Sequence, residues 1–131
     1  MLGPATHTLQ WTVKQYNPIT ADIGDTLVFE YSSDHNVYEL PAGMTECPTD
    51  FFESGRVATL RGETTDSPVS ITLDKAGVFT FACEMYDHCE RGQIVTVTVG
   101  NTLTRSNACL QVSPLFGLMA ATLMAAMAWR I

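Results

Sequence analysis

The chain has 131 residues, 46% of them apolar, and a formal net charge of −7 with a pI near 4.7. This length suits one domain with appendages. No basic stripe is present, which argues against nucleic-acid binding. The acidity is interpreted first as a solvated surface, and only weakly as a sign of a neutral or cationic partner. Apolar residues gather from Leu110 to the C-terminus, so residues 1–100 form the predicted domain.

Five segments alternate apolar and polar residues and are rich in β-branched and aromatic side chains, which is typical of strands. They are residues 7–13, 26–32, 69–73, 77–83 and 93–99. Short turn-forming sequences that contain Gly, Pro, Asn or Asp separate these five segments. Short strands at this spacing predict an all-β sandwich or barrel. The sequence PTDFFESG at 48–55 is the one helix candidate in the body, with Thr49 or Asp50 as its cap and Gly55 at its end.

Metal-binding side chains occur close together near the end of this domain. Cys83, His88 and Gln93 stand five residues apart in a predicted loop that closes onto a strand. His35 lies upstream in another strand-like run, residues 27–40. One thiolate and two imidazoles with a weak fourth ligand make up the ligand set of a blue-copper electron-transfer site. The sequence therefore predicts copper ligation by His35, Cys83 and His88, with the Gln93 amide as axial ligand.

Each of these residues also has an ordinary interpretation. A buried cysteine is commonly a small apolar residue, an isolated histidine is commonly a surface residue, and a glutamine at the start of a strand is commonly an edge residue. The shared spacing favours the metal site over these alternatives. Met44 and Met85 stand at the wrong offsets to replace Gln93 as axial ligand. His7, the third histidine, matches no motif and is interpreted as non-functional.

The order of these residues matches a known pattern. The run GDTLVFEYSSDHNVYEL at 24–40 is a Gly-Asp turn, a strand and a His followed by Asn-Val. The second element is Cys83-x4-His-Cys89-x3-Gln, and the third is Cys47, twelve residues after His35. Over about residues 5–99 the chain resembles the phytocyanins, the blue-copper proteins of the plant cell surface within the cupredoxins. Gln rather than Met at position 93 resembles the stellacyanin branch.

The resemblance implies a Greek-key β-sandwich or barrel of cupredoxin type that holds one type 1 copper. It also implies a disulfide between Cys47 and Cys89. The alternative for these two cysteines is a zinc site with histidines, although adjacent His88 and Cys89 suit tetrahedral geometry poorly. In the family the second histidine ligand lies near the surface and passes the electron, and by resemblance that is His88. Tyr86 and Asp87 precede it, where the family usually has Pro-Gly.

The C-terminal residues form a separate region. Residues 101–109 are a polar stretch with small residues, and 110–131 are an apolar tail. This order is typical of a glycolipid-anchor signal, with Ser106 or Asn107 as the attachment residue. The resemblance adds support, since many phytocyanins are anchored in this way. The alternative is a membrane helix, for which the tail is about long enough.

These features predict an extracytoplasmic protein that carries single electrons by Cu(I)/Cu(II) cycling, acting as a monomer on a small-molecule or protein redox partner. No enzyme motif competes. Two alternatives are a surface protein that buffers or delivers copper, and a recognition module on the same fold. The expected location is the extracellular face of the plasma membrane, and four cysteines fit an oxidising compartment. The N-terminus lacks a signal peptide, so we expect that a leader was removed.

Overall fold

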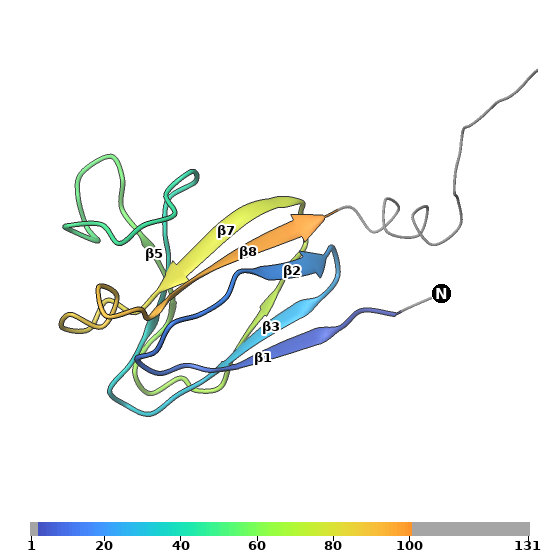
Figure 1. The fold of residues 1–131 in the computed structure, drawn as a ribbon, viewed down its shortest axis with the longest axis horizontal. Helices are drawn as coiled ribbons and strands as arrows, with labels where there is room; N and C mark the ends of the chain where they lie inside the picture. The colour runs from blue at the N-terminus through green and yellow to red at the C-terminus, as the bar shows by residue number, and fades with distance from the viewer. Residues whose placement is uncertain (1–2, 101–131) are drawn as a thin grey trace, which may run out of the picture. The chain divides into compact units, whose positions relative to one another are not determined.

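Eight β-strands provide the regular structure of residues 3–100, the part of the chain that the computed structural model describes (Figure 1). They are β1 (Thr6–Gln10), β2 (Ile19–Asp22), β3 (Thr26–Glu30), β4 (Val37–Glu39), β5 (Thr59–Gly62), β6 (Val69–Thr72), β7 (Gly77–Ala82) and β8 (Ile94–Gly100). The prediction of an all-β domain is confirmed. Among the described residues no helix could cross a membrane.

The strands form two sheets whose neighbours are mostly not consecutive in the sequence. One sheet has the order β1-β3-β6, and the other has the order β2-β8-β7-β4-β5. The pairs β1–β3 and β2–β8 are parallel, and the remaining pairs are antiparallel. Crossovers between sheets are typical of Greek-key sandwiches. The β7–β8 loop, residues 83–93, lies at the opposite end of these strands from the tip of β8 (Figure 1).

The core lies between the sheets and follows the two-residue period of the strands. Leu27 and Phe29 on β3 face Val95 and Val97 on β8, and all four are at most 1% exposed. Trp11 packs at the end of this core nearest the β7–β8 loop, with its ring centroid 4.8 Å from that of Phe29. Because such a core is densely packed, it gives the loops at its end a rigid base.

The strand prediction is right for five strands, its strand-like run at 27–40 also contains the short β4, and it omits β2 and β5. The short strands β2, β4 and β5 lack a long alternating pattern, and pairing with longer neighbours forms them. The helix prediction for 48–55 is wrong, because the segment is a series of turns. The Asp50 side chain accepts a hydrogen bond from the Phe52 N–H, which competes with a helical turn. Phe51 is buried, and its carbonyl accepts a hydrogen bond from Ala58.

His7, Cys47 and Cys89 each have a structural partner. The His7 Nε2 lies 2.9 Å from Asp25 Oδ2. Burial opposes ionisation of Asp25, but hydrogen bonds from the N–H of Ala5, from His7 and from the N–H of Asp22 outweigh it and lower the pKa of Asp25 to about 2.

The predicted disulfide is confirmed: it joins Cys47 to Cys89, with 5.9 Å between their Cα atoms.

The predictions for the C-terminal region concern residues outside those that the structure describes. They are the linker at 101–109, the tail at 110–131, and attachment at Ser106 or Asn107.

Candidate metal centre

Three of the predicted ligands meet at the end of the sandwich. Cys83 directly follows β7, His88 lies in the β7–β8 loop, and His35 lies between β3 and β4. The Cys83 Sγ is 3.6 Å from His88 Nδ1 and 4.0 Å from His35 Nδ1. The two Nδ1 atoms are 3.3 Å apart. Both imidazoles therefore present the same nitrogen to the sulfur.

This triangle fits a single metal ion. Ligands bound at about 2.0–2.3 Å to one metal stand roughly 3.3–3.8 Å apart. Two sides of the triangle lie in this range, and the third, from Cys83 Sγ to His35 Nδ1, is slightly longer at 4.0 Å. The donor atoms of His35, Cys83 and His88 all lie within 4.8 Å of one another, and this is the one such cluster within residues 3–100. Cys83 and His35 are buried, and His88 is half-buried. The sulfur is thus shielded from solvent while one imidazole reaches toward the surface.

Gln93 supports this assignment because its side chain is buried without a partner. It is fully buried, and neither Oε1 nor Nε2 has a hydrogen-bond partner among residues 3–100. An unpaired buried amide costs free energy, and buried polar groups normally have partners. The amide is near enough to His35 to favour the charged form of that imidazole, yet it meets hydrogen-bond geometry with none of its neighbours. An unpaired amide oxygen beside this triangle is suited to a weak axial ligand.

The protonation states of the site also suit a cation. Burial lowers the pKa of His35, and the facing His88 lowers it further, against smaller opposing effects of Asp34 and Gln93. Burial raises the pKa of Cys83, although the N–H groups of Asn36 and Met85 favour the thiolate. Burial therefore favours the neutral forms of His35 and Cys83. A metal binds the deprotonated thiol, so metal binding releases a proton.

Asn36 links the two segments that carry the ligands. Its Oδ1 accepts a hydrogen bond from the Glu84 N–H at 2.9 Å, and its Nδ2 donates to Glu84 Oε1 at 3.2 Å. Its carbonyl accepts a hydrogen bond from Trp11 Nε1 at 2.9 Å. These bonds fix His35 relative to Cys83 and to the core. The His-Asn pair within residues 24–40 is the one sequence signal for this role, and it does not predict these hydrogen bonds.

Hydrogen bonds within the β7–β8 loop hold His88 in place. The Gln93 N–H donates to the His88 carbonyl, and the Cys83 N–H donates to the Gln93 carbonyl at 3.1 Å. Gly92 has a φ of 114°, and a Cβ there would lie 2.8 Å from the Lys14 carbonyl oxygen. Only glycine suits this turn against the Lys14 backbone. Together with the disulfide at Cys89, these contacts make the loop rigid.

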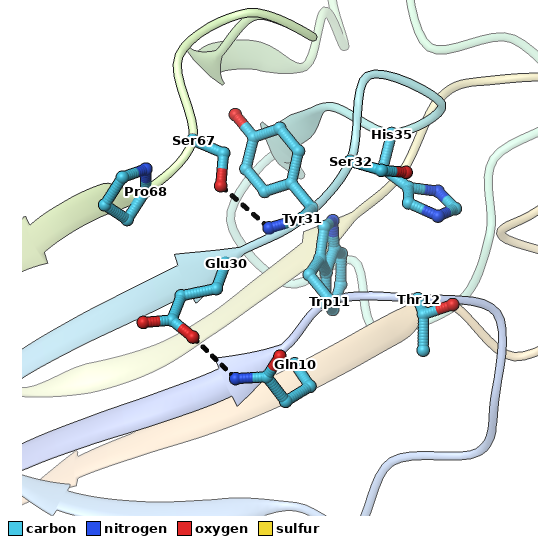
Figure 2. A pocket seen from close by; sticks show the side chains of 9 residues that line it. All are labelled: Gln10, Trp11, Thr12, Glu30, Tyr31, Ser32, His35, Ser67 and Pro68. Atoms are coloured by element: carbon cyan, nitrogen blue, oxygen red, sulfur yellow. Dashed lines mark hydrogen bonds between the residues drawn. The ribbon is translucent and has the colours of Figure 1, made fainter.

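The surface next to the site has two parts. Beside His35 lies an open groove of about 590 Å³ that Trp11, Tyr31, Ser67 and Pro68 also line (Figure 2). Tyr31 is held there by a 2.8 Å hydrogen bond from its N–H to Ser67 Oγ. The second part is the outer edge of His88, which Tyr86 covers.

The phenol of Tyr31, in the groove beside His35, stays neutral. Burial raises the pKa of Tyr31 to about 12, and nearby carboxylates add to the effect.

Comparison with known proteins agrees with this geometry. The family model described as "Plastocyanin-like domain" matches residues 10–93, more than half of the chain. Cucumber stellacyanin, solved with Cu2+ at pH 7.0, is 23% identical over 77% of this chain and 99% of its own, with a TM-score of 0.58. Spinach plantacyanin is 21% identical over 72% of this chain and 99% of its own, with a TM-score of 0.49. No curated protein matches. The resemblance to phytocyanins is confirmed, and the chain belongs to the plastocyanin-like domain family.

Proposed function

We propose that this protein is a type 1 copper protein that carries single electrons and is not an enzyme. The observation that carries the proposal is the buried His35–Cys83–His88 triangle with the unpaired amide of Gln93 beside it. A thiolate and two imidazoles with a weak axial donor suit both Cu(I) and Cu(II). The family match supports the same conclusion.

The residues of the chain have separate roles in this proposal. His35, Cys83 and His88 would hold the copper, and the Gln93 amide oxygen would be its weak fourth ligand. Copper in this donor set supplies a one-electron couple. The hydrogen bonds of Asn36 and the Cys47–Cys89 disulfide hold the ligand segments in one arrangement. A rigid ligand set changes little between oxidation states, so little reorganisation accompanies electron transfer.

His88 is the proposed electron port. It is half-buried, whereas Cys83 is fully buried and His35 is 8% exposed. Its imidazole therefore offers the shortest way from the buried sulfur to a redox partner at the surface. We infer that the protein acts as a monomer on a small-molecule or protein partner, because its ligands all come from one chain.

We also propose that the protein works outside the cytoplasm, on the extracellular face of the plasma membrane. The Cys47–Cys89 disulfide supports an oxidising compartment. The tail after residue 109 supports a glycolipid anchor at Ser106 or Asn107. Expressed with a leader in eukaryotic cells, the protein should be released by a phosphatidylinositol-specific phospholipase. A retained protein whose terminal peptide still contains Trp129 would instead have a membrane helix.

An absorption spectrum tests the copper assignment. The oxidised, copper-loaded protein should show a strong thiolate-to-copper band at about 600 nm. Cys83→Ser should abolish this band. A colourless copper-loaded protein that binds zinc tightly would refute the assignment. A reversible reduction potential would separate electron transfer from copper buffering.

A further inference from the structure

Tyr86 is an outlier in both exposure and backbone conformation. Its side chain is 82% exposed, more than any other large apolar side chain among residues 3–100. Its φ of 49° is the one positive value at a non-glycine residue in the same range. Positive φ is uncommon for a bulky side chain, and strained residues gather at functional sites. The fold thus keeps a strained aromatic residue at a place where it buries little.

The turn that contains Tyr86 would suit a smaller residue better. The His88 N–H donates to the Met85 carbonyl at 3.0 Å, so Tyr86 is the first central residue of a four-residue turn. Positive φ at that position strongly favours glycine. Met85 packs against the core, while Tyr86 points outward. The stability of the fold therefore gives no reason for a tyrosine here.

The aromatic ring lies directly against the proposed electron port. The ring centroids of Tyr86 and His88 are 5.6 Å apart in an edge-to-face arrangement. Any partner that approaches His88 from this side meets the Tyr86 ring. Exposed tyrosines supply a large contact area at low cost in side-chain entropy, and they are enriched among residues that dominate binding energy.

The surroundings of the port are negatively charged. An acidic residue precedes or follows each ligand of the triangle: Asp34, Glu84 and Asp87. Asp87 lies beside Tyr86, and 69% of its side chain is exposed. Arg91 lies 4.0 Å from Asp87, which is too far for a strong pair at such exposure. Such a field attracts cations and repels anions.

We propose that Tyr86 is the docking contact for a positively charged one-electron redox protein, and that the exposed carboxylate of Asp87 steers this partner to it. The inference rests on the proposed function. In the exchange one electron leaves the reduced member and enters the oxidised one, and no bond or proton is transferred. Tyr86 and Asp87 act by positioning the partner against His88.

Stability measurements separate docking from a structural role. Tyr86→Gly removes the ring and relieves the backbone strain, so it should unfold at an equal or higher denaturant concentration than the wild type. Tyr86→Ala keeps the strained φ and should unfold at a lower concentration than Tyr86→Gly. A clear loss of stability in Tyr86→Gly would show that the ring serves the fold, and would overturn the proposal.

Kinetic measurements test docking itself. Reduced copper-loaded protein is mixed with ferric cytochrome c, a basic redox protein, and with the anionic oxidant hexacyanoferrate(III). Tyr86→Gly should slow the reaction with cytochrome c about tenfold or more, and Tyr86→Phe should not. Asp87→Asn should lower the rate of the reaction with cytochrome c a few-fold but raise the rate of the reaction with hexacyanoferrate(III). Added salt should lower the rate of the wild-type reaction with cytochrome c.

Two controls lie at the far end of the sandwich. Val78→Thr removes another exposed apolar side chain, and Asp74→Asn removes another carboxylate, and neither should change the rate with cytochrome c. If Tyr86→Gly and wild type react with cytochrome c at equal rates, and the absorption band and reduction potential are unchanged, the docking proposal is overturned while the proposed function stands. Slowing by Glu30→Gln but not by Asp87→Asn would place docking at the His35 groove and overturn it too. A wild type without the band would instead refute the proposed function.

Discussion

Replacing Gln93 with methionine should stabilise the metal-free protein, although Gln93 is among its most buried residues. An amide buried without a hydrogen bond costs about 1–3 kcal/mol, and both polar atoms of Gln93 lack a partner. Methionine has a similar volume, so repacking costs less than about 1.5 kcal/mol. The free energy of unfolding should therefore rise by about 1 kcal/mol, which for a domain of this size raises Tm by roughly 4–8 °C.

The copper-loaded protein should respond differently. A thioether binds Cu(II) more weakly than an amide oxygen does, so the oxidised state loses stability relative to the reduced state. Gln93→Met should therefore raise the reduction potential while retaining the blue band. By linkage, the variant should also gain less stability from Cu(II) than the wild type gains. Denaturant unfolding with and without copper and voltammetry measure these quantities.

A glutamine outside the site provides the control. Gln10 is exposed and donates a 2.6 Å hydrogen bond to Glu30, so Gln10→Met should change stability by no more than about 0.5 kcal/mol and leave the potential unchanged. A metal-free Gln93→Met protein that is less stable, with an unchanged potential, would show that the Gln93 amide serves the packing of the domain and does not reach the metal.

Three further predictions concern stability. Asp25→Asn should lower the free energy of unfolding at pH 7 by about 2 kcal/mol after allowance for solvent screening, because the pKa of Asp25 is lowered to about 2. That stabilisation is fully present above about pH 4 and is lost as the pH falls toward 2. The free energy of unfolding of the variant, measured over the same pH range, should not show this loss. Replacing Cys47 and Cys89 with alanine should cost roughly 3–4 kcal/mol in denaturant unfolding, because the disulfide spans 42 residues. Gly62→Ala should cost about 1–3 kcal/mol by thermal unfolding, since its new Cβ would meet Val69.

For each of these three predictions, one outcome would contradict the reasoning. An acid-unfolding curve that Asp25→Asn leaves unchanged would mean that the carboxylate is not stabilised in the native state. Mass mapping that finds Cys83 in a disulfide would contradict both the bridge and the metal site. A Gly62→Ala protein as stable as the wild type would show that β5 moves away from Val69 at little cost.

The ligand set could be predicted from the sequence because it depends on local spacing. Cys83, His88 and Gln93 belong to one loop between strands with a strong alternating pattern, and the structure brings the first two together with His35. The fold class follows from the same alternation. Whether Gln93 binds the metal stays a prediction.

Features that depend on tertiary contacts could not be predicted. The strand β4 has three residues and exists because β5 and β7 pair with it. The segment 48–55 has helix-like ends, but Phe51 is buried in an apolar cluster with Leu40, Ala58 and Ala82, and the chain follows it inward. The backbone conformation of Tyr86 depends on the closed loop around it, and tyrosine at that position carries no sequence signal for positive φ.

The hydrogen bonds between Asn36 and Glu84 have a consequence for folding kinetics. They join residues 48 positions apart, as does the contact between His35 and Cys83. Contacts at such separation form after much of the chain is ordered, because loop closure costs entropy first. The complete ligand set should therefore be absent from the folding transition state. A bound metal would then slow unfolding with little effect on the folding rate, and would protect the domain kinetically.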